Sequence, residues 1–200
     1  MISRLAEFVA KRLQHNGIIE TDDKDLYVYA FFMIFSYAFF LLLSICMGVV
    51  LKIFFESILF FIVLCIVRGF AGGIHAQSEK ACTFLTTVSI IISEILIKIL
   101  VIYDAVVLAV AVMALSTICI FIFSPLVSKQ KNFNYEEKMA LKKKVIFSTL
   151  SSVIVSILSF ILDKHSFGCF GFSIAVGVGV SSFLLVLGKI EQVNKKDVHR

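Results

Sequence analysis

The stretch that decides the fold is VYAFFMIFSYAFFLLLSICMGVV, residues 28–50, which contains no charged residue. A helix needs about 20 apolar residues to cross the hydrocarbon core of a bilayer, and this stretch is long enough. The composition of the whole chain agrees, because 60% of the 200 residues are hydrophobic and only 16% are charged. The mean hydropathy of +1.00 lies outside the range of soluble globular proteins. We therefore expect an integral membrane protein.

Five further apolar runs follow this one along the chain. They occupy residues 53–67, 83–102, 105–123, 145–162 and 167–187. We predict an all-α membrane protein with about six transmembrane helices, organised as a single membrane domain over residues 1–200. The 53–67 run is short and contains Glu56. It would cover only about 22 Å of a core that is roughly 30 Å thick, so we expect it to be tilted, to have the bilayer thinned around it, or to be only partly inserted.

The first 26 residues have a different pattern. From Ile2 to His15, apolar residues fall on one helical face and charged residues on the other, and the pattern ends at Asn16-Gly17. This favours an amphipathic helix lying on the membrane surface, although a helix packed on the protein's own loops would show the same pattern. We expect no cleavable signal peptide, because these residues are charged and the first apolar run is too long.

Lysine and arginine gather in the N-terminal helix and at residues 68–80, 129–144 and 189–200. The connections between these regions carry few charges. The positive-inside rule therefore places both termini in the cytoplasm. The formal net charge of +5 then reflects topology and contact with anionic membrane lipids, and we expect no nucleic-acid partner.

Small residues recur every four positions in the last two runs. Such faces allow close approach between helix backbones, so they predict a pair formed by the fifth and sixth spans, or else a dimer contact. The residues are Ser148, Ser152 and Ser156 in one run and Ser173, Gly177 and Ser181 in the other.

The polar segment RGFAGGIHAQSEKAC, residues 68–82, carries a histidine and a cysteine seven positions apart. Ser78 is a suitable N-cap for the third span, which would place Cys82 at about the fourth helical position, where the helix N-terminus favours a thiolate. A nearby His75 would activate that thiol further. On one straight helix the two α-carbons would lie about 10.5 Å apart, so the segment must bend. The alternative is an ordinary glycine-bearing loop with an incidental histidine and cysteine.

The other cysteines point to less specific roles. Cys46, Cys65 and Cys119 lie inside apolar runs, where cysteine usually packs as a small hydrophobic residue. His165 and Cys169 are four residues apart, but two ligands make a weak metal site. We expect no metal and no other cofactor.

Residues 68–82 strongly resemble the signature of the accessory gene regulator B family, membrane endopeptidases that process precursor peptides in Gram-positive quorum sensing. Residues 124–144 look like the second cytoplasmic loop of that family, and the N-terminus and six runs fit its layout. The resemblance implies that Cys82 is the nucleophile and His75 its partner base, with Arg68 and Gly73 as supporting residues.

The resemblance also implies the reaction. The C-terminal tail of a precursor signal peptide is removed through a thioester to the enzyme, and a precursor side chain then closes a thiolactone or lactone ring. It further implies a homodimer in the cytoplasmic membrane of a Gram-positive cell.

Four other polar residues have roles that we assign only by position. Gln77 is a possible oxyanion donor. Glu79 either orients the histidine or complements the helix dipole. Lys129 and Lys131 belong to the basic loop, which either holds an acidic substrate tail or enforces orientation.

A transporter or channel subunit is the main alternative from another functional class. Glu94 and Lys98 lie inside the third run, and intramembrane charges are often functional. Their i, i+4 spacing also allows them to neutralise each other as a structural pair. A membrane scaffold without enzymatic activity is a third possibility.

Overall fold

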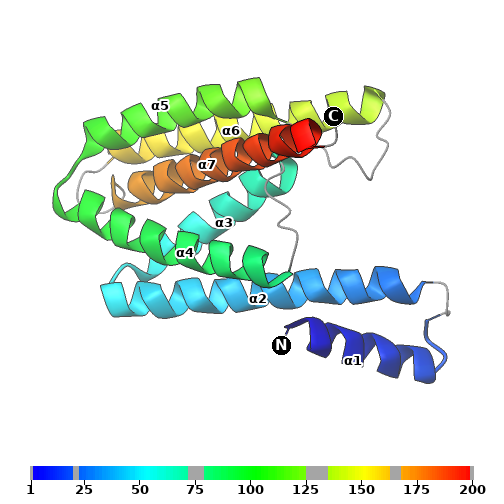
Figure 1. Cartoon of the computed structure of the whole chain (residues 1–200). Helices are drawn as coiled ribbons and strands as arrows, with labels where there is room; N and C mark the ends of the chain where they lie inside the picture. Colours follow the sequence, from blue (N-terminus) through cyan, green and yellow to red (C-terminus); the bar gives the residue numbers. More distant parts are fainter. Residues whose placement is uncertain (1, 20–22, 72–78, 125–134, 163–167, 199–200) are drawn as a thin grey trace. The chain divides into compact units, whose positions relative to one another are not determined.

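The computed structural model describes residues 2–19, 23–71, 79–124, 135–162 and 168–198, and all regular structure in these residues is helical. The helices are α1 (Ile2–His15), α2 (Lys24–Leu51), α3 (Phe54–Ala71), α4 (Glu79–Ile102), α5 (Val106–Phe123), α6 (Tyr135–Leu162) and α7 (Gly168–Val198) (Figure 1). All except α1 are long and apolar enough to cross a membrane, which confirms the predicted class and six spans. Internal contacts divide the chain into two compact units, residues 1–43 and residues 44–200.

In the first unit, α1 has the bounds expected from its amphipathic pattern. The helix ends where Gly17 adopts a φ of 70°. The Gly17 amide donates to the Gln14 carbonyl at 3.0 Å and the Ile18 amide donates to the Leu13 carbonyl at 3.0 Å, which is a Schellman motif. Glycine suits this position because it reaches a positive φ without steric cost.

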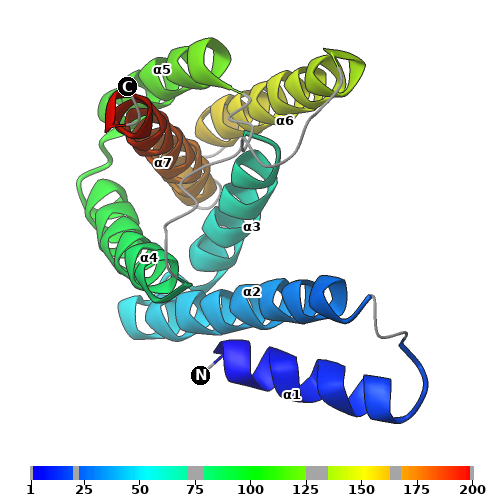
Figure 2. The ribbon, with the colours of Figure 1, turned by 45° about the vertical axis from the view of Figure 1, so that its right-hand side comes forward.

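In the second unit, α7 is the central helix, and α3, α4, α5 and α6 all pack against it (Figure 2). Every residue from 171 to 178 is buried. A helix that is apolar on all sides is expected at such a position. A cluster of buried side chains from α3, α5, α6 and α7 forms the core of this unit: Val63, Val67, Ala71, Ile120, Val145, Ile174, Val178 and Leu185.

The small residues of the last two spans contact more than one neighbour. Ser156 Oγ donates to the Gly171 carbonyl at 3.0 Å, so α6 and α7 do pack together as predicted. Gly177, however, faces α3, since a Cβ atom added there would lie 3.0 Å from Val63 Cγ1 and 3.3 Å from the Phe60 carbonyl oxygen. The central position of α7 explains the difference, because its faces are shared among four neighbours.

Several helices extend further than the apolar runs predicted, among them α3, α6 and α7. Helix α3 has 18 residues and continues past the 53–67 run to Ala71, so a length of about 27 Å replaces the 22 Å expected. Helix α6 begins at Tyr135, which makes residues 135–144 of the predicted basic loop helical. Helix α7 continues to Val198.

Two of the short connections use residues other than glycine at positive φ. Lys52 has a φ of 58° and Asp104 has a φ of 45°. At the first of these, the Ile53 amide donates to the Gly48 carbonyl at 2.8 Å, and at the second the Ala105 amide donates to the Leu100 carbonyl at 3.1 Å. These 6→1 bonds end α2 and α4 in the same way as α1 ends.

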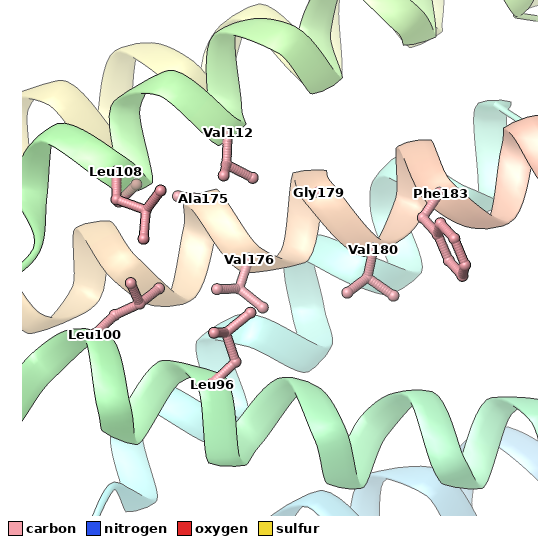
Figure 3. Close-up of a pocket in the computed structure, with 10 residues that line it drawn as sticks. Leu96, Leu100, Leu108, Val112, Ala175, Val176, Gly179, Val180 and Phe183 are labelled. Carbon is pink, nitrogen blue, oxygen red and sulfur yellow. The ribbon is translucent and has the colours of Figure 1, made fainter.

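A cavity of about 280 Å³ lies between α4, α5 and α7 (Figure 3). Its lining residues are apolar and include no ionisable group. The lining residues are Leu96, Leu100, Leu108, Ala109, Val112, Ala175, Val176, Gly179, Val180 and Phe183.

Candidate active site

The segment predicted to be catalytic is framed by the end of α3 and the start of α4. Arg68 lies in the last turn of α3. Helix α4 begins at Glu79, so Cys82 is its fourth residue, as the N-cap argument predicted. The unpaired amide groups of a helix N-terminus give this end a partial positive charge, which favours a thiolate over a thiol. The position of Cys82 is therefore suited to a reactive cysteine.

The other residues named from the sequence fall in two parts of the chain. Gly73, His75 and Gln77 lie within 72–78, and Lys129 and Lys131 lie within 125–134, so all five are outside the described residues. The site therefore rests on Arg68 and on the helical position of Cys82.

Arg68 reaches across from α3 to α4. Its Nη1 donates to Thr86 Oγ1 at 3.3 Å, and the Thr86 side chain is only 5% exposed. The neighbouring Val67 and Ala71 are fully buried in the core, so the backbone that carries Arg68 is firmly packed. A lone interfacial arginine would extend toward the headgroups, whereas this arginine has a defined partner on the helix that carries the cysteine.

A basic region at the start of α6 lies at the same end of the second unit. The ends of α3 and α5 and the starts of α4 and α6 point to this end of the bundle, since sequential helices run in alternating directions (Figure 1). Lys138, Lys142, Lys143 and Lys144 in the first turns of α6 are all exposed. A row of exposed cations is thus present on the side of the bundle that carries Arg68.

Aromatic side chains at this end are open to the surroundings. Phe84, two residues after Cys82, is 71% exposed, and Phe70 is 36% exposed. Exposed aromatic rings at a membrane surface can cover a bound peptide and keep water from it.

Glu94 does not pair with Lys98. Its carboxyl group is fully buried and accepts hydrogen bonds from Ser44 Oγ at 2.5 Å and Ser57 Oγ at 3.2 Å, and no ion pair joins it to Lys98 within the described residues. The Glu94 carboxyl group, in the middle of α4, therefore links α4 by hydrogen bonds to the last turns of α2 and the start of α3. Gly48 permits this packing, because a Cβ atom there would lie 2.5 Å from Ser57 Oγ.

The remaining cysteines within the described residues are free thiols: Cys46, Cys65, Cys119 and Cys169. Among the same residues, no group of three or more His, Cys, Asp or Glu side chains is arranged to hold a metal ion.

Sequence reasoning missed Thr86, Ser44 and Ser57. Thr86 had one usable signal, since it lies four residues after Cys82 and thus on the same face of a helix. The two serines had none, because their contact with Glu94 joins positions 50 and 37 residues apart.

The family model and the similar proteins that match this chain point to the same family. Residues 4–185 match the family model described as Accessory gene regulator B. AgrB-like protein 2 of Clostridium perfringens (strain 13 / Type A) is 24% identical over 191 residues, which cover 90% of this chain and 86% of that protein. An AgrB-like protein of Clostridium perfringens (strain SM101 / Type A) is 22% identical over 168 residues, covering 81% and 78%. No solved structure matches this chain.

Proposed function

This chain belongs to the accessory gene regulator B family, and from that membership we propose that it is a cysteine endopeptidase embedded in the membrane. Membership in this family makes it a multi-pass membrane protein of a quorum-sensing system. The proposed reaction removes the C-terminal tail of a precursor peptide. The proposed compartment is the cytoplasmic membrane, with the basic ends of the helices in the cytoplasm.

The position of Cys82 in the first turn of α4 is the observation that carries the proposal. A catalytic cysteine must be a thiolate near neutral pH, and a helix N-terminus supports that state. Arg68, bonded to the same helix through Thr86, adds a permanent positive charge nearby. An incidental cysteine would not require either feature.

The first step joins the precursor to the enzyme. The Cys82 sulfur attacks the carbonyl carbon of the scissile peptide bond, and a carbon–sulfur bond forms while the carbon–nitrogen bond breaks. His75 takes the thiol proton and delivers it to the departing amine. The products of this step are the free tail and a thioester on Cys82.

The second step releases the precursor as a ring. A thiol or hydroxyl of the precursor attacks the thioester carbonyl, gives up its proton, and forms a thiolactone or lactone, while the Cys82 sulfur is protonated and restored. Water would give a linear product instead. Phe70 and Phe84 are suited to shield the thioester from water, since both are exposed at this end of the bundle.

The test is processing of tagged precursor peptides from the same cell in membranes that contain the full chain. The parent should release the tail and form a cyclic product, and Cys82→Ala and His75→Ala should each abolish both products. Among these three proteins, only the parent should release the tail. Tail release that survives in Cys82→Ala would remove the cysteine from the mechanism and refute the proposal.

A further inference from the structure

We propose that Thr86 is a positioning residue that holds the Arg68 guanidinium one helical turn below Cys82, where its charge supports the thiolate. This inference rests on the proposed function, because it assigns a role within the same site. It starts from a single contact between two helices, in which Arg68 Nη1 donates to Thr86 Oγ1 at 3.3 Å.

The register of α4 connects this contact to the nucleophile. Cys82 and Thr86 are four residues apart in one continuous helix. Residues with that spacing share a face and are separated by a rise of about 6 Å. The contact therefore brings the guanidinium to the face of α4 that carries Cys82.

The chemistry of arginine makes that placement useful. A guanidinium stays charged at any pH at which the protein works, so its field is constant. The field adds to that of the helix N-terminus, and both favour the thiolate. The contact with Thr86 uses only one of the five N–H donors of the Arg68 guanidinium.

The hydroxyl of Thr86 is needed because the arginine side chain is long. Without an acceptor on α4, the guanidinium would extend toward the lipid headgroups and water, away from the cysteine. Thr86 itself is 5% exposed, and the fully buried Val67 and Ala71 fix the backbone on either side of Arg68. The donor and the acceptor are thus both held in place by packing.

The charged or titratable groups around this contact must be controlled in any measurement of pH dependence. On α3, Cys65 lies within electrostatic reach of Arg68. On α4, Glu79 and Lys80 belong to the first turn. His75 precedes that turn in the sequence. Cys65 is replaced in every protein of the test, and the other three groups are kept the same.

The test uses the full chain in liposomes with Cys82 as its sole cysteine, and measures its rate of alkylation by N-ethylmaleimide from pH 5 to 10. Thr86→Val removes the hydroxyl and keeps the shape of the side chain. We expect it to shift the rate profile to higher pH and to slow alkylation at pH 7 about twofold to fivefold, as a partly displaced charge would. Thr86→Ser keeps the acceptor and should follow the parent. Thr87→Val makes the same chemical change on another side of α4, and its rate profile should also follow that of the parent.

A double-mutant cycle tests whether Thr86 acts through Arg68. In an Arg68→Gln background, Thr86→Val should have no further effect on the profile. An effect that persists there would overturn the positioning role. A Thr86→Val profile equal to the parent's would also overturn the positioning role. If the His75→Ala profile were shifted in that same experiment, the endopeptidase proposal would stand without Thr86. A parent Cys82 that is inert at every pH would overturn both proposals.

Discussion

Substitution of Gly48 by alanine provides a quantitative test of the packing around Glu94. An added Cβ atom would lie 2.5 Å from Ser57 Oγ and 2.7 Å from Ser57 Cβ. Both distances are shorter than real carbon contacts, so the end of α2 and the start of α3 must separate. The same movement would pull Ser57 Oγ away from Glu94 Oε2, to which it donates at 3.2 Å.

The size of the effect follows from two costs and one smaller gain. Forcing a methyl group into a packed interface costs about 1–3 kcal/mol. Weakening a buried hydrogen bond to the carboxyl group costs about a further 1 kcal/mol. Replacement of a helical glycine by alanine returns roughly 0.5–1 kcal/mol through backbone entropy. We therefore expect Gly48→Ala to lower the free energy of unfolding by about 1–3 kcal/mol.

The assay is thermal denaturation in detergent, followed by size-exclusion chromatography of the heated samples. Gly69→Ala is the matched control, since nothing lies within 4 Å of a Cβ atom at that position. The control should melt at or above the parent temperature, and Gly48→Ala should melt roughly 3–10 °C below it. In a Ser57→Gly background, Gly48→Ala should cost much less, because the obstructing atoms are gone. Equal melting temperatures for Gly48→Ala and Gly69→Ala would show that an added methyl group at Gly48 does not collide with Ser57.

Three further predictions use the same melting assay. Gly177→Ala should cost less, about 1 kcal/mol, because the nearest atom to its added Cβ, Val63 Cγ1, would lie at 3.0 Å, whereas the nearest atom at Gly48 would lie at 2.5 Å; a loss as large as that of Gly48→Ala would contradict this expectation. Lys52→Val should lower the melting temperature and Lys52→Gly should not, since a β-branched residue fits poorly at a φ of 58°, and the reverse order would be inconsistent with the turn. The pKa of Glu7 is lowered by its hydrogen bond to Lys11 and by the charge of that lysine. The ion pair therefore stabilises the folded protein above the ordinary carboxyl pKa, and this contribution is lost as the pH falls through the lowered pKa. Both side chains are exposed, so Lys11→Ala should leave the melting temperature unchanged at pH 7 and at pH 3, and a clear drop at pH 7 would show that α1 depends on this pair.

The number and type of spans could be predicted because hydropathy reports the solvent of each segment directly. Helix ends were harder to predict. The apolar run that predicts α3 stops before Arg68, because hydropathy assigns arginine to water, yet α3 continues to Ala71. Arginine is a good helix former, so a charge at this position ends the apolar run without ending the helix.

In the candidate site, features that depend on neighbouring residues in the sequence could be predicted, whereas contacts between helices could not. The helical position of Cys82 could be predicted, since a capping serine and a polar first turn are local features. The contact of Thr86 with Arg68 could not, because the i, i+4 spacing from Cys82 places Thr86 on the same helical face but does not indicate a partner 18 residues away. The i, i+4 spacing of Glu94 and Lys98 predicted a pair, but the hydroxyls of two other helices were closer to the buried carboxyl group.

The proposed mechanism requires that Cys82 and His75 form an activated pair. Its most direct test is the pH profile of Cys82 alkylation in the parent and in His75→Ala, with the other four cysteines replaced. An activated pair should give a half-maximal alkylation rate in the parent well below a pH of about 8.5, the ordinary pKa of a cysteine thiol, and a clear shift to higher pH in His75→Ala. A cysteine that reacts only above that pH, and that is indifferent to the histidine, would contradict it.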